Sequence, residues 1–340
     1  MVPGILILVL LVLGLLALGP TPPVSTRTEE PELPEDIAEL DDWLRRREAK
    51  VPALREELAW RIAWASGARR RSRKVLIYFH GFTASHRETA PLCDELAAKL
   101  GANLVLTRLR GHGRDADALR DVTVRDWLQD ARDALAIARR IGEEVVVIGK
   151  STGAGLVLWA SEREWFGEVH ALMLMSPNFE PWHPMARALT LPWGHILVRI
   201  LVGRYRHVPA YDELHERYWT RHYHTNCLLT MMALVERANL VNLEAIRTPV
   251  WFAWSPQDRT VRADRIAAAY ARLRAPIREK LVLDRSHAAT AHVLAGDALA
   301  PDNTALMVRE MAAFLARVDA AHEASPGVVA AVGDPHAARP

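Results

Sequence analysis

Short apolar stretches alternate with amphipathic helical stretches from residue 74 to about residue 315, and this alternation limits the possible folds more than any other feature of the chain. The apolar stretches are short and rich in β-branched and aromatic residues, which is typical of strands buried on both faces. We expect strands at residues 74–80, 103–107, 144–148, 171–175, 249–254 and 280–283. Strands separated by helices form a mostly parallel sheet covered by helices on both faces, so the predicted class is α/β.

Helical periodicity fills the intervals between these strands. We expect helices at residues 37–44, 90–100, 124–140, 154–161, 264–273 and 304–315. No internal repeat is present, and we place one folded domain at residues 37–316.

The alternation stops between the fourth and fifth of these strands, where about 70 residues are dense in Trp, Tyr, His, Arg and Met. An insertion this late in an α/β sheet usually packs over the carboxyl ends of the strands, where ligands bind. We therefore predict a helical lid at about residues 178–245. The alternative is a structural elaboration whose aromatic residues are ordinary core.

Both ends of the chain differ from this domain. Residues 1–24 carry no charge and include the apolar run Ile5 to Leu18, which predicts a single membrane anchor. A cleaved signal segment is the alternative, although no Lys or Arg precedes the run and Pro20 follows the expected cleavage triplet. The protein is then membrane-anchored, or exported if the segment is cleaved, and the side of the membrane stays open. Residues 25–36 predict a proline-rich acidic linker, and residues 317–340 a disordered tail.

Composition excludes several classes of protein. The chain is 50% hydrophobic and 25% charged, which is ordinary for a globular domain and not for a disordered or multi-span membrane protein. Its 43 basic and 41 acidic residues give a net charge of +2, so nucleic acid is not an expected partner. Cys93 and Cys227 are too few and too far apart for a disulfide framework or a zinc site. The expected partner is a small molecule, and the oligomeric state stays open.

The pentapeptide Gly149-Lys150-Ser151-Thr152-Gly153 joins the expected strand at 144–148 to the expected helix at 154–161. In this G-x-S-x-G pattern the glycines permit a tight turn that lifts a serine oxygen above the sheet. A phosphate-binding loop is excluded, because the glycine that it requires five positions before Gly149 is Glu144. Ser151 is therefore a candidate nucleophile.

A nucleophilic serine needs a histidine base and an acid that orients the base. Asp258 follows the strand at 249–254, and His287 and His292 both follow the strand at 280–283. Either histidine is able to reach Ser151 from that loop.

A second glycine turn follows the first strand, in the sequence Phe79-His80-Gly81-Phe82-Thr83. There the backbone amide of Phe82 is expected to join that of Thr152 in an oxyanion hole. We expect His80 to be structural.

These motifs resemble the α/β-hydrolase superfamily, in particular its bacterial carboxylesterase, monoacylglycerol lipase and lysophospholipase-like members. The resemblance runs from about residue 60 to residue 315 and rests on segments 80–82, 110–113, 149–153 and 292–297 together with Asp258. It implies Ser151 as nucleophile, Asp258 as acid and His292 as base, with Phe82 and Thr152 as the oxyanion hole.

Two points about the resemblance matter below. His292 is preferred over His287 because it lies 22 rather than 27 residues before Phe314, nearer the spacing expected in this fold. Many relatives carry a small or aromatic residue before the serine and a second glycine after Gly153, whereas this chain has Lys150 and Ala154. We expect Lys150 to turn to solvent rather than to place a cation beside the site.

The sequence thus predicts a serine hydrolase that cleaves carboxylic esters of an apolar acyl group through an acyl-enzyme. The expected substrate is a small ester or lipid, and no metal or organic cofactor is required. Two alternatives are an acyltransferase that uses the same acyl-enzyme and a non-catalytic lipid-binding protein on a hydrolase fold.

Overall fold

The computed structural model describes residue 14 and residues 18–20, 24–284 and 288–324. Its centre is a seven-stranded sheet in the order β1-β3-β2-β4-β5-β8-β9. The strands are β1 (Arg61–Ala63), β2 (Ser72–Phe79), β3 (Asn103–Leu106), β4 (Gly142–Lys150), β5 (Ala171–Met175), β8 (Val250–Trp254) and β9 (Arg278–Val282). All neighbours are parallel except the pair β1 and β3. The predicted α/β class is confirmed, and the short antiparallel edge strand β1 is an addition.

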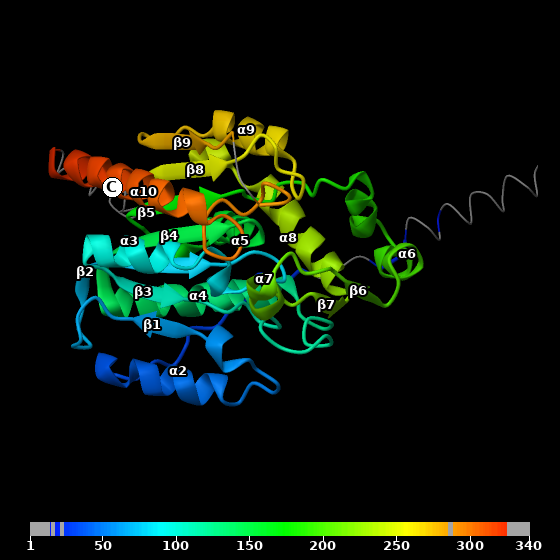
Figure 1. Cartoon of the computed structure of the whole chain (residues 1–340), viewed down its shortest axis with the longest axis horizontal. Helices are drawn as coiled ribbons and strands as arrows, with labels where there is room; N and C mark the ends of the chain where they lie inside the picture. The colour runs from blue at the N-terminus through cyan, green and yellow to red at the C-terminus, as the bar shows by residue number, and fades with distance from the viewer. Residues whose placement is uncertain (1–13, 15–17, 21–23, 285–287, 325–340) are drawn as a thin grey trace, which may run out of the picture.

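Helices cover both faces of the sheet (Figure 1). They are α2 (Leu40–Glu48), α3 (Leu92–Leu100), α4 (Val124–Ile141), α5 (Thr152–Ala160), α8 (Cys227–Leu240), α9 (Ala263–Arg272) and α10 (Thr304–Ala324). Successive strand residues point to opposite faces. On β4, Val145 and Val147 belong to the core with α4, α5 and α8, whereas Val146 and Ile148 belong to the core with α3 and α10.

Helix α10 is longer than the sequence predicted. It continues to Ala324, through the first residues of the segment expected to be a disordered tail. Val318 is buried in the core, and the Asp319 carboxylate lies 2.8 Å from Lys74 Nζ and 2.7 Å from His170 Nε2. These contacts explain the extension, because they give the alanine-rich end of the helix tertiary partners. Residues 325–340 lie outside the described residues.

Residues 178–245, called the lid below, contain η5 (Pro184–Thr190), α6 (Gly194–Leu201), β6 (Tyr205–His207), α7 (Glu213–Tyr218), β7 (His222–His224) and α8. Strands β6 and β7 form an antiparallel pair, so the lid is not wholly helical as predicted. Each of the two strands has three residues, too few to show an alternating pattern in the sequence. In Figure 1 the carboxyl ends of β4, β5 and β8 point toward this part of the molecule.

The linker at residues 25–36 contains no helix or strand, and it packs against the domain. Gln129 on α4 exchanges two hydrogen bonds with the backbone of Glu29, at 2.8 and 2.7 Å. Arg132 donates to the carbonyl of Thr28 at 2.8 Å.

Most of the predicted anchor or signal segment at residues 1–24 lies outside the described residues. Among the residues that are described, no helix has both the length and the apolar character needed to cross a bilayer.

Candidate active site

Ser151 occupies a strained turn between β4 and α5. Its φ of 54° and ψ of −116° lie outside the regions that side chains prefer, and its amide donates to the Met175 carbonyl at 2.8 Å. A Cβ on Gly153 would lie 2.3 Å from the Phe79 carbonyl oxygen, and one on Gly149 would lie 2.7 Å from the Ala154 Cα. The turn therefore needs both glycines of the motif.

Ser151, His292 and Asp258 form one hydrogen-bonded chain. The His292 Nε2 lies 2.9 Å from the Ser151 Oγ, and the His292 Nδ1 lies 2.7 Å from the Asp258 Oδ2. Because Nδ1 faces a carboxylate, it carries the ring proton and leaves Nε2 free to accept one. All three residues are buried, with exposed fractions of 6% or less.

Further hydrogen bonds hold the two partners of the serine. The second oxygen of Asp258 accepts hydrogen bonds from the amides of Thr260 and Val261 at 2.7 and 2.9 Å. The His292 carbonyl accepts one from the Ser176 hydroxyl, directly after β5, at 3.1 Å. Segments that follow four strands of the sheet thus contribute to one site. His287 lies outside the described residues.

The loop after β2 contains one backbone amide whose hydrogen bonding differs from that of its neighbours. The amides of Gly81, Thr83 and Ala84 donate to Glu88 Oε1, His112 Nε2 and the Gly81 carbonyl. Among the hydrogen bonds of the described residues, none has the Phe82 amide as its donor. The Gly81 carbonyl also accepts from His80 Nδ1 at 2.9 Å. Because the peptide is planar and trans, the Phe82 N–H points away from that carbonyl.

The Thr152 amide lies in the first turn of α5, directly after Ser151. Amides in a first turn have no carbonyl partner within their own helix, and the helix dipole favours negative charge there. The arrangement therefore pairs a serine, a histidine and an acid with two backbone amides suited to a developing oxyanion.

Comparison with known proteins identifies the family of this chain. A family model described as serine aminopeptidase, S33 (Hydrolase_4) matches residues 70–287, which include Ser151 and Asp258. This chain belongs to that family of α/β hydrolases.

One curated relative matches a part of the hydrolase. A thermostable monoacylglycerol lipase from Bacillus sp. (strain H-257) is 30% identical over 87 residues, which are 26% of this chain and 34% of that protein. The chain thus matches about a third of the relative's length.

Solved structures share the fold of the hydrolase. The structure reported for LipS and LipT, two metagenome-derived lipolytic enzymes, has a TM-score of 0.63 at 18% identity and covers 78% of this chain and 99% of its own. A soluble variant of monoglyceride lipase from Saccharomyces cerevisiae has a TM-score of 0.58 at 15% identity, with coverages of 76% and 91%.

Two buried histidines fix the loops of the hydrolase around Phe82. His80 Nε2 accepts from the Leu109 amide at 3.0 Å, and His112 Nε2 accepts from the Thr83 amide at 3.0 Å. Burial lowers the pKa of His80 to about 3 and that of His112 well below its usual value of 6.5. Both rings are therefore neutral acceptors, and His80 has the structural position expected of it.

The expectation for Lys150 is wrong. Its side chain is 5% exposed, and its Nζ lies 3.1 Å from Oε2 of the fully buried Glu88 instead of turning to solvent. Sequence reasoning also missed Glu88, because no motif distinguishes it from other acidic residues in the stretch after Gly81. Only its contacts mark it.

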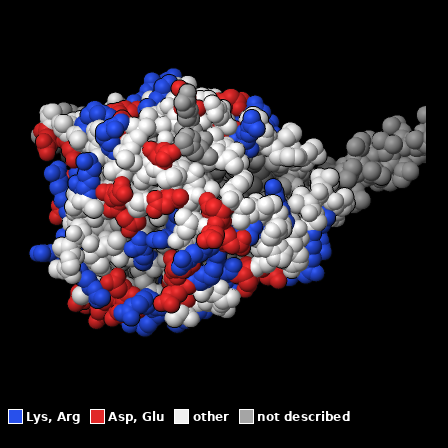
Figure 2. Space-filling model, in the orientation of Figure 1, with Lys and Arg blue, Asp and Glu red and all other residues white. Residues whose placement is uncertain are grey.

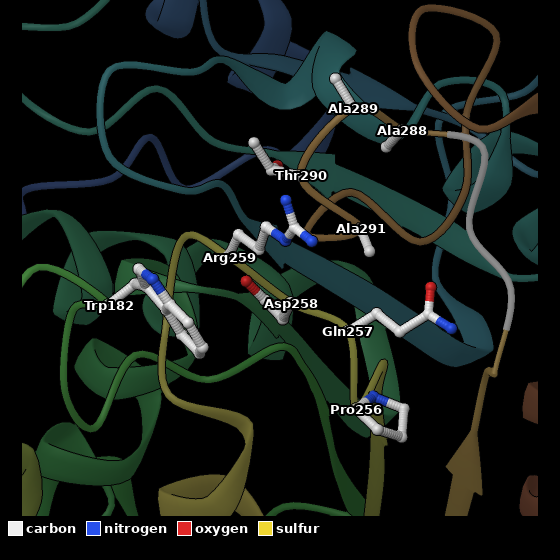
Figure 3. Close-up of a pocket in the computed structure, with 9 residues that line it drawn as sticks. All are labelled: Trp182, Pro256, Gln257, Asp258, Arg259, Ala288, Ala289, Thr290 and Ala291. Carbon is white, nitrogen blue, oxygen red and sulfur yellow. The ribbon is translucent and has the colours of Figure 1, made fainter.

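A hollow of about 720 Å³ lies beside the acid. In Figure 3, Trp182 of the lid faces the loop of residues 256–259, and residues 288–291 close another side. Neither Ser151 nor His292 lines this hollow, so it is adjacent to the hydrogen-bonded chain and does not contain it.

One group of possible metal ligands occurs in the described part of the chain, at Glu144, His170 and Asp319. The Lys74 Nζ lies 2.5 Å from the Glu144 carboxylate and 2.8 Å from that of Asp319. This ammonium group already supplies the positive charge that the two carboxylates require. The group lies by the amino ends of β4 and β5, at the opposite end of these strands from Ser151.

Proposed function

We propose that this hydrolase cleaves carboxylic esters of an apolar acyl group through an acyl-enzyme on Ser151. The observation that carries the proposal is the hydrogen-bonded chain from Ser151 through His292 to Asp258 at the end of a strained strand-to-helix turn. The relatives named as monoacylglycerol lipases support an ester as the substrate.

The geometry supports a mechanism of acyl transfer. His292 Nε2 takes the hydroxyl proton as Ser151 Oγ bonds to the ester carbonyl carbon, and Asp258 stabilises the imidazolium. The amides of Phe82 and Thr152 bind the oxyanion. Collapse expels the alcohol, which receives the proton from His292. A water molecule then gives a proton to His292 as its oxygen bonds to the acyl carbon. The bond from that carbon to Ser151 Oγ breaks, Ser151 Oγ takes the proton back from His292, and the acid is released.

The surface of the lid favours a lipid as the source of that ester. Several large apolar side chains of the lid are exposed: Trp182, Met185, Leu191, Ile196, Ile200, Leu201 and Val202. Residues 182–208 contain four arginines and no acidic residue. An apolar surface flanked by basic residues is typical of segments that lie on anionic membranes.

The position of Pro20 agrees with this orientation. The Trp193 amide, at the start of α6, donates to the Pro20 carbonyl at 3.1 Å, so Pro20 lies next to the exposed part of the lid. In Figure 2 the surface at the right-hand end of the described part of the molecule is mainly white and is bordered by blue side chains. We propose that this face of the lid contacts an anionic lipid surface. Attachment of residues 1–24 to a membrane stays a prediction of the sequence.

The proposal is tested with a fluorophosphonate probe and a soluble butyrate ester. The parent protein should react with both, and Ser151→Ala should abolish labelling and hydrolysis. Ser161→Ala is the matched control, because this serine lies just after the same helix and its hydroxyl donates to the Leu158 carbonyl at 2.8 Å. Unchanged labelling of folded Ser151→Ala would show that another residue is the nucleophile. Transfer of the acyl group to added glycerol in preference to water would identify an acyltransferase.

A further inference from the structure

Glu88 lies at the junction of the two loops that form the candidate site. Its Oε1 accepts hydrogen bonds from the Gly81 amide at 2.5 Å and from the Tyr78 hydroxyl at 2.9 Å. Its Oε2 lies 3.1 Å from the Nζ of Lys150, the residue before the serine. One carboxylate therefore connects the loop after β2 to the turn after β4.

The two charged groups depend on each other. The Glu88 side chain is 0% exposed and that of Lys150 is 5% exposed, so water is unable to solvate either charge well. A buried charge that loses its partner is strongly destabilising, whereas the intact pair contributes little net stability. The contribution of the pair to fold stability therefore does not explain why two charged groups are buried beside the serine.

Gly81 lies in contact with both members of the pair and with the nucleophile. A Cβ added to Gly81 would lie 3.2 Å from Glu88 Oε2, 3.3 Å from Lys150 Cδ and 3.3 Å from Ser151 Cβ. Little free space therefore separates the Gly81 backbone from the pair and from Ser151.

The pair also orients the amide that follows Gly81. Glu88 holds the Gly81 N–H, while His80 holds the Gly81 carbonyl. With both peptide groups of Gly81 held, the direction of the Phe82 N–H is fixed. A rotation of Gly81 would move that amide relative to the Ser151 oxygen.

We propose that Lys150 and Glu88 are positioning residues that set the Phe82 amide relative to Ser151. The inference rests on the proposed function, because it assigns a purpose to the pair only if an oxyanion forms at Ser151. Neither residue touches the substrate in this scheme. An oxyanion exists in the transition state and not in the bound ester, so loss of the pair should lower kcat and leave KM nearly unchanged.

The experiment compares Lys150→Met with Lys74→Met in the full chain. Lys74 is the matched control, since its side chain is 6% exposed and pairs with two carboxylates by the amino end of β4. Both variants remove a buried cation and should lower Tm. Only Lys150→Met should also lower kcat for the butyrate ester and the rate of fluorophosphonate labelling, each by about 10- to 100-fold, the lower part of the range for loss of an oxyanion donor.

Two further variants separate positioning from packing. Lys150→Arg keeps the charge and should recover part of the lost kcat. The double variant Lys150→Met with Glu88→Gln removes both charges and should recover Tm more than it recovers kcat.

The outcomes distinguish the inference from the function on which it rests. If the parent labels and turns over ester while Lys150→Met matches it in kcat and labelling rate, the pair only stabilises the fold and the inference is overturned. A rise in KM without a fall in kcat also overturns it. If Ser151 of the parent neither labels nor supports turnover, the proposed function fails and the inference fails with it.

Discussion

The carboxyl end of the sheet buries polar residues, whereas the lid exposes apolar ones. At the sheet, Ser151, Asp258 and His292 are buried, and each has a hydrogen-bond partner. In the lid, Ile200 is 74% exposed and Leu201 55% exposed, although both are apolar. The usual preference for apolar burial is thus reversed in both places.

The difference shows which property each region has to provide. Proton transfer and oxyanion binding require groups fixed to within fractions of an ångström, and strands with buried side chains provide that rigidity. An exposed apolar surface costs solubility and is explained when it meets lipid or another apolar surface. Changes at the sheet should therefore affect every substrate, and changes at the exposed lid only those substrates presented at a lipid surface.

The largest effect is expected at the base. His292→Ala should lower kcat by at least about 10⁴-fold, because members of a catalytic triad act as a unit. His287→Ala, the alternative in the sequence, should retain most of the activity. The two variants are compared for butyrate hydrolysis at matched folding, judged by circular dichroism. Collapse of activity in His287→Ala with retention in His292→Ala would reverse the assignment.

Acid should lower the free energy of unfolding, because buried neutral histidines lie near the carboxyl end of the sheet. Burial lowers the pKa of His80 and of His86 to about 3, from 6.5. Between pH 3 and pH 6.5 the unfolded chain binds more protons at these histidines than the folded chain does. Their contribution to the free energy of unfolding is therefore complete above pH 6.5 and is lost as the pH falls toward 3. Each histidine contributes a slope of up to about 1.4 kcal/mol per pH unit. Burial raises the pKa of Asp130 to about 7, so this one carboxyl offsets part of the fall.

The acid effect is measured by urea unfolding between pH 7 and pH 4.5. His86→Gln keeps a donor for the Ala59 carbonyl, which the histidine Nε2 contacts at 3.2 Å. The variant should reduce the slope of the unfolding free energy against pH by up to about 1.4 kcal/mol per pH unit, the contribution of one proton. A slope equal to that of the parent would mean that His86 does not contribute.

A smaller effect is expected at the exposed face of the lid. Ile200→Asp should reduce hydrolysis of a monoacylglycerol in phosphatidylglycerol vesicles by about tenfold relative to a soluble ester, because it places a negative charge on a surface proposed to meet anionic lipid. Val282→Asp, on β9, is the control, since Val282 is an exposed apolar residue outside the lid. Equal losses on vesicles and on soluble ester would show that the face does not meet lipid.

The smallest effect for a single chemical group, counted per methylene, concerns acyl length. The buried apolar residues of the lid include Met231, whose Sδ accepts a hydrogen bond from the side-chain amide of Asn178. The backbone amide of Asn178 donates to the Ser151 carbonyl at 3.1 Å, so Met231 lies near the serine. If these apolar residues line an acyl pocket, each added methylene should contribute up to about 0.8 kcal/mol, or about fourfold in kcat/KM. The measurement is kcat/KM for p-nitrophenyl esters from two to eight acyl carbons. A flat series would exclude the pocket.

Local sequence rules predicted the central layers well and the connecting pieces less well. The six expected strands are present because each shows its own run of apolar residues, whereas β1, β6 and β7 have three residues each and leave no pattern. The local pattern ends α10 too early, because Val318 packs in the core and Asp319 pairs with Lys74 of the sheet, contacts that neighbours in sequence do not reveal.

The sequence by itself determined the strand-turn-helix around Ser151, because strand periodicity and the need for glycine at 149 and 153 are local properties of the backbone. It also limited the base to two histidines. The tertiary structure alone joined His292 to Ser151, 141 residues away, and turned Lys150 inward to Glu88. Both contacts depend on which distant segments meet at the carboxyl end of the sheet. A buried charge there is stable only with a partner of opposite charge, and no local sequence pattern identifies that partner.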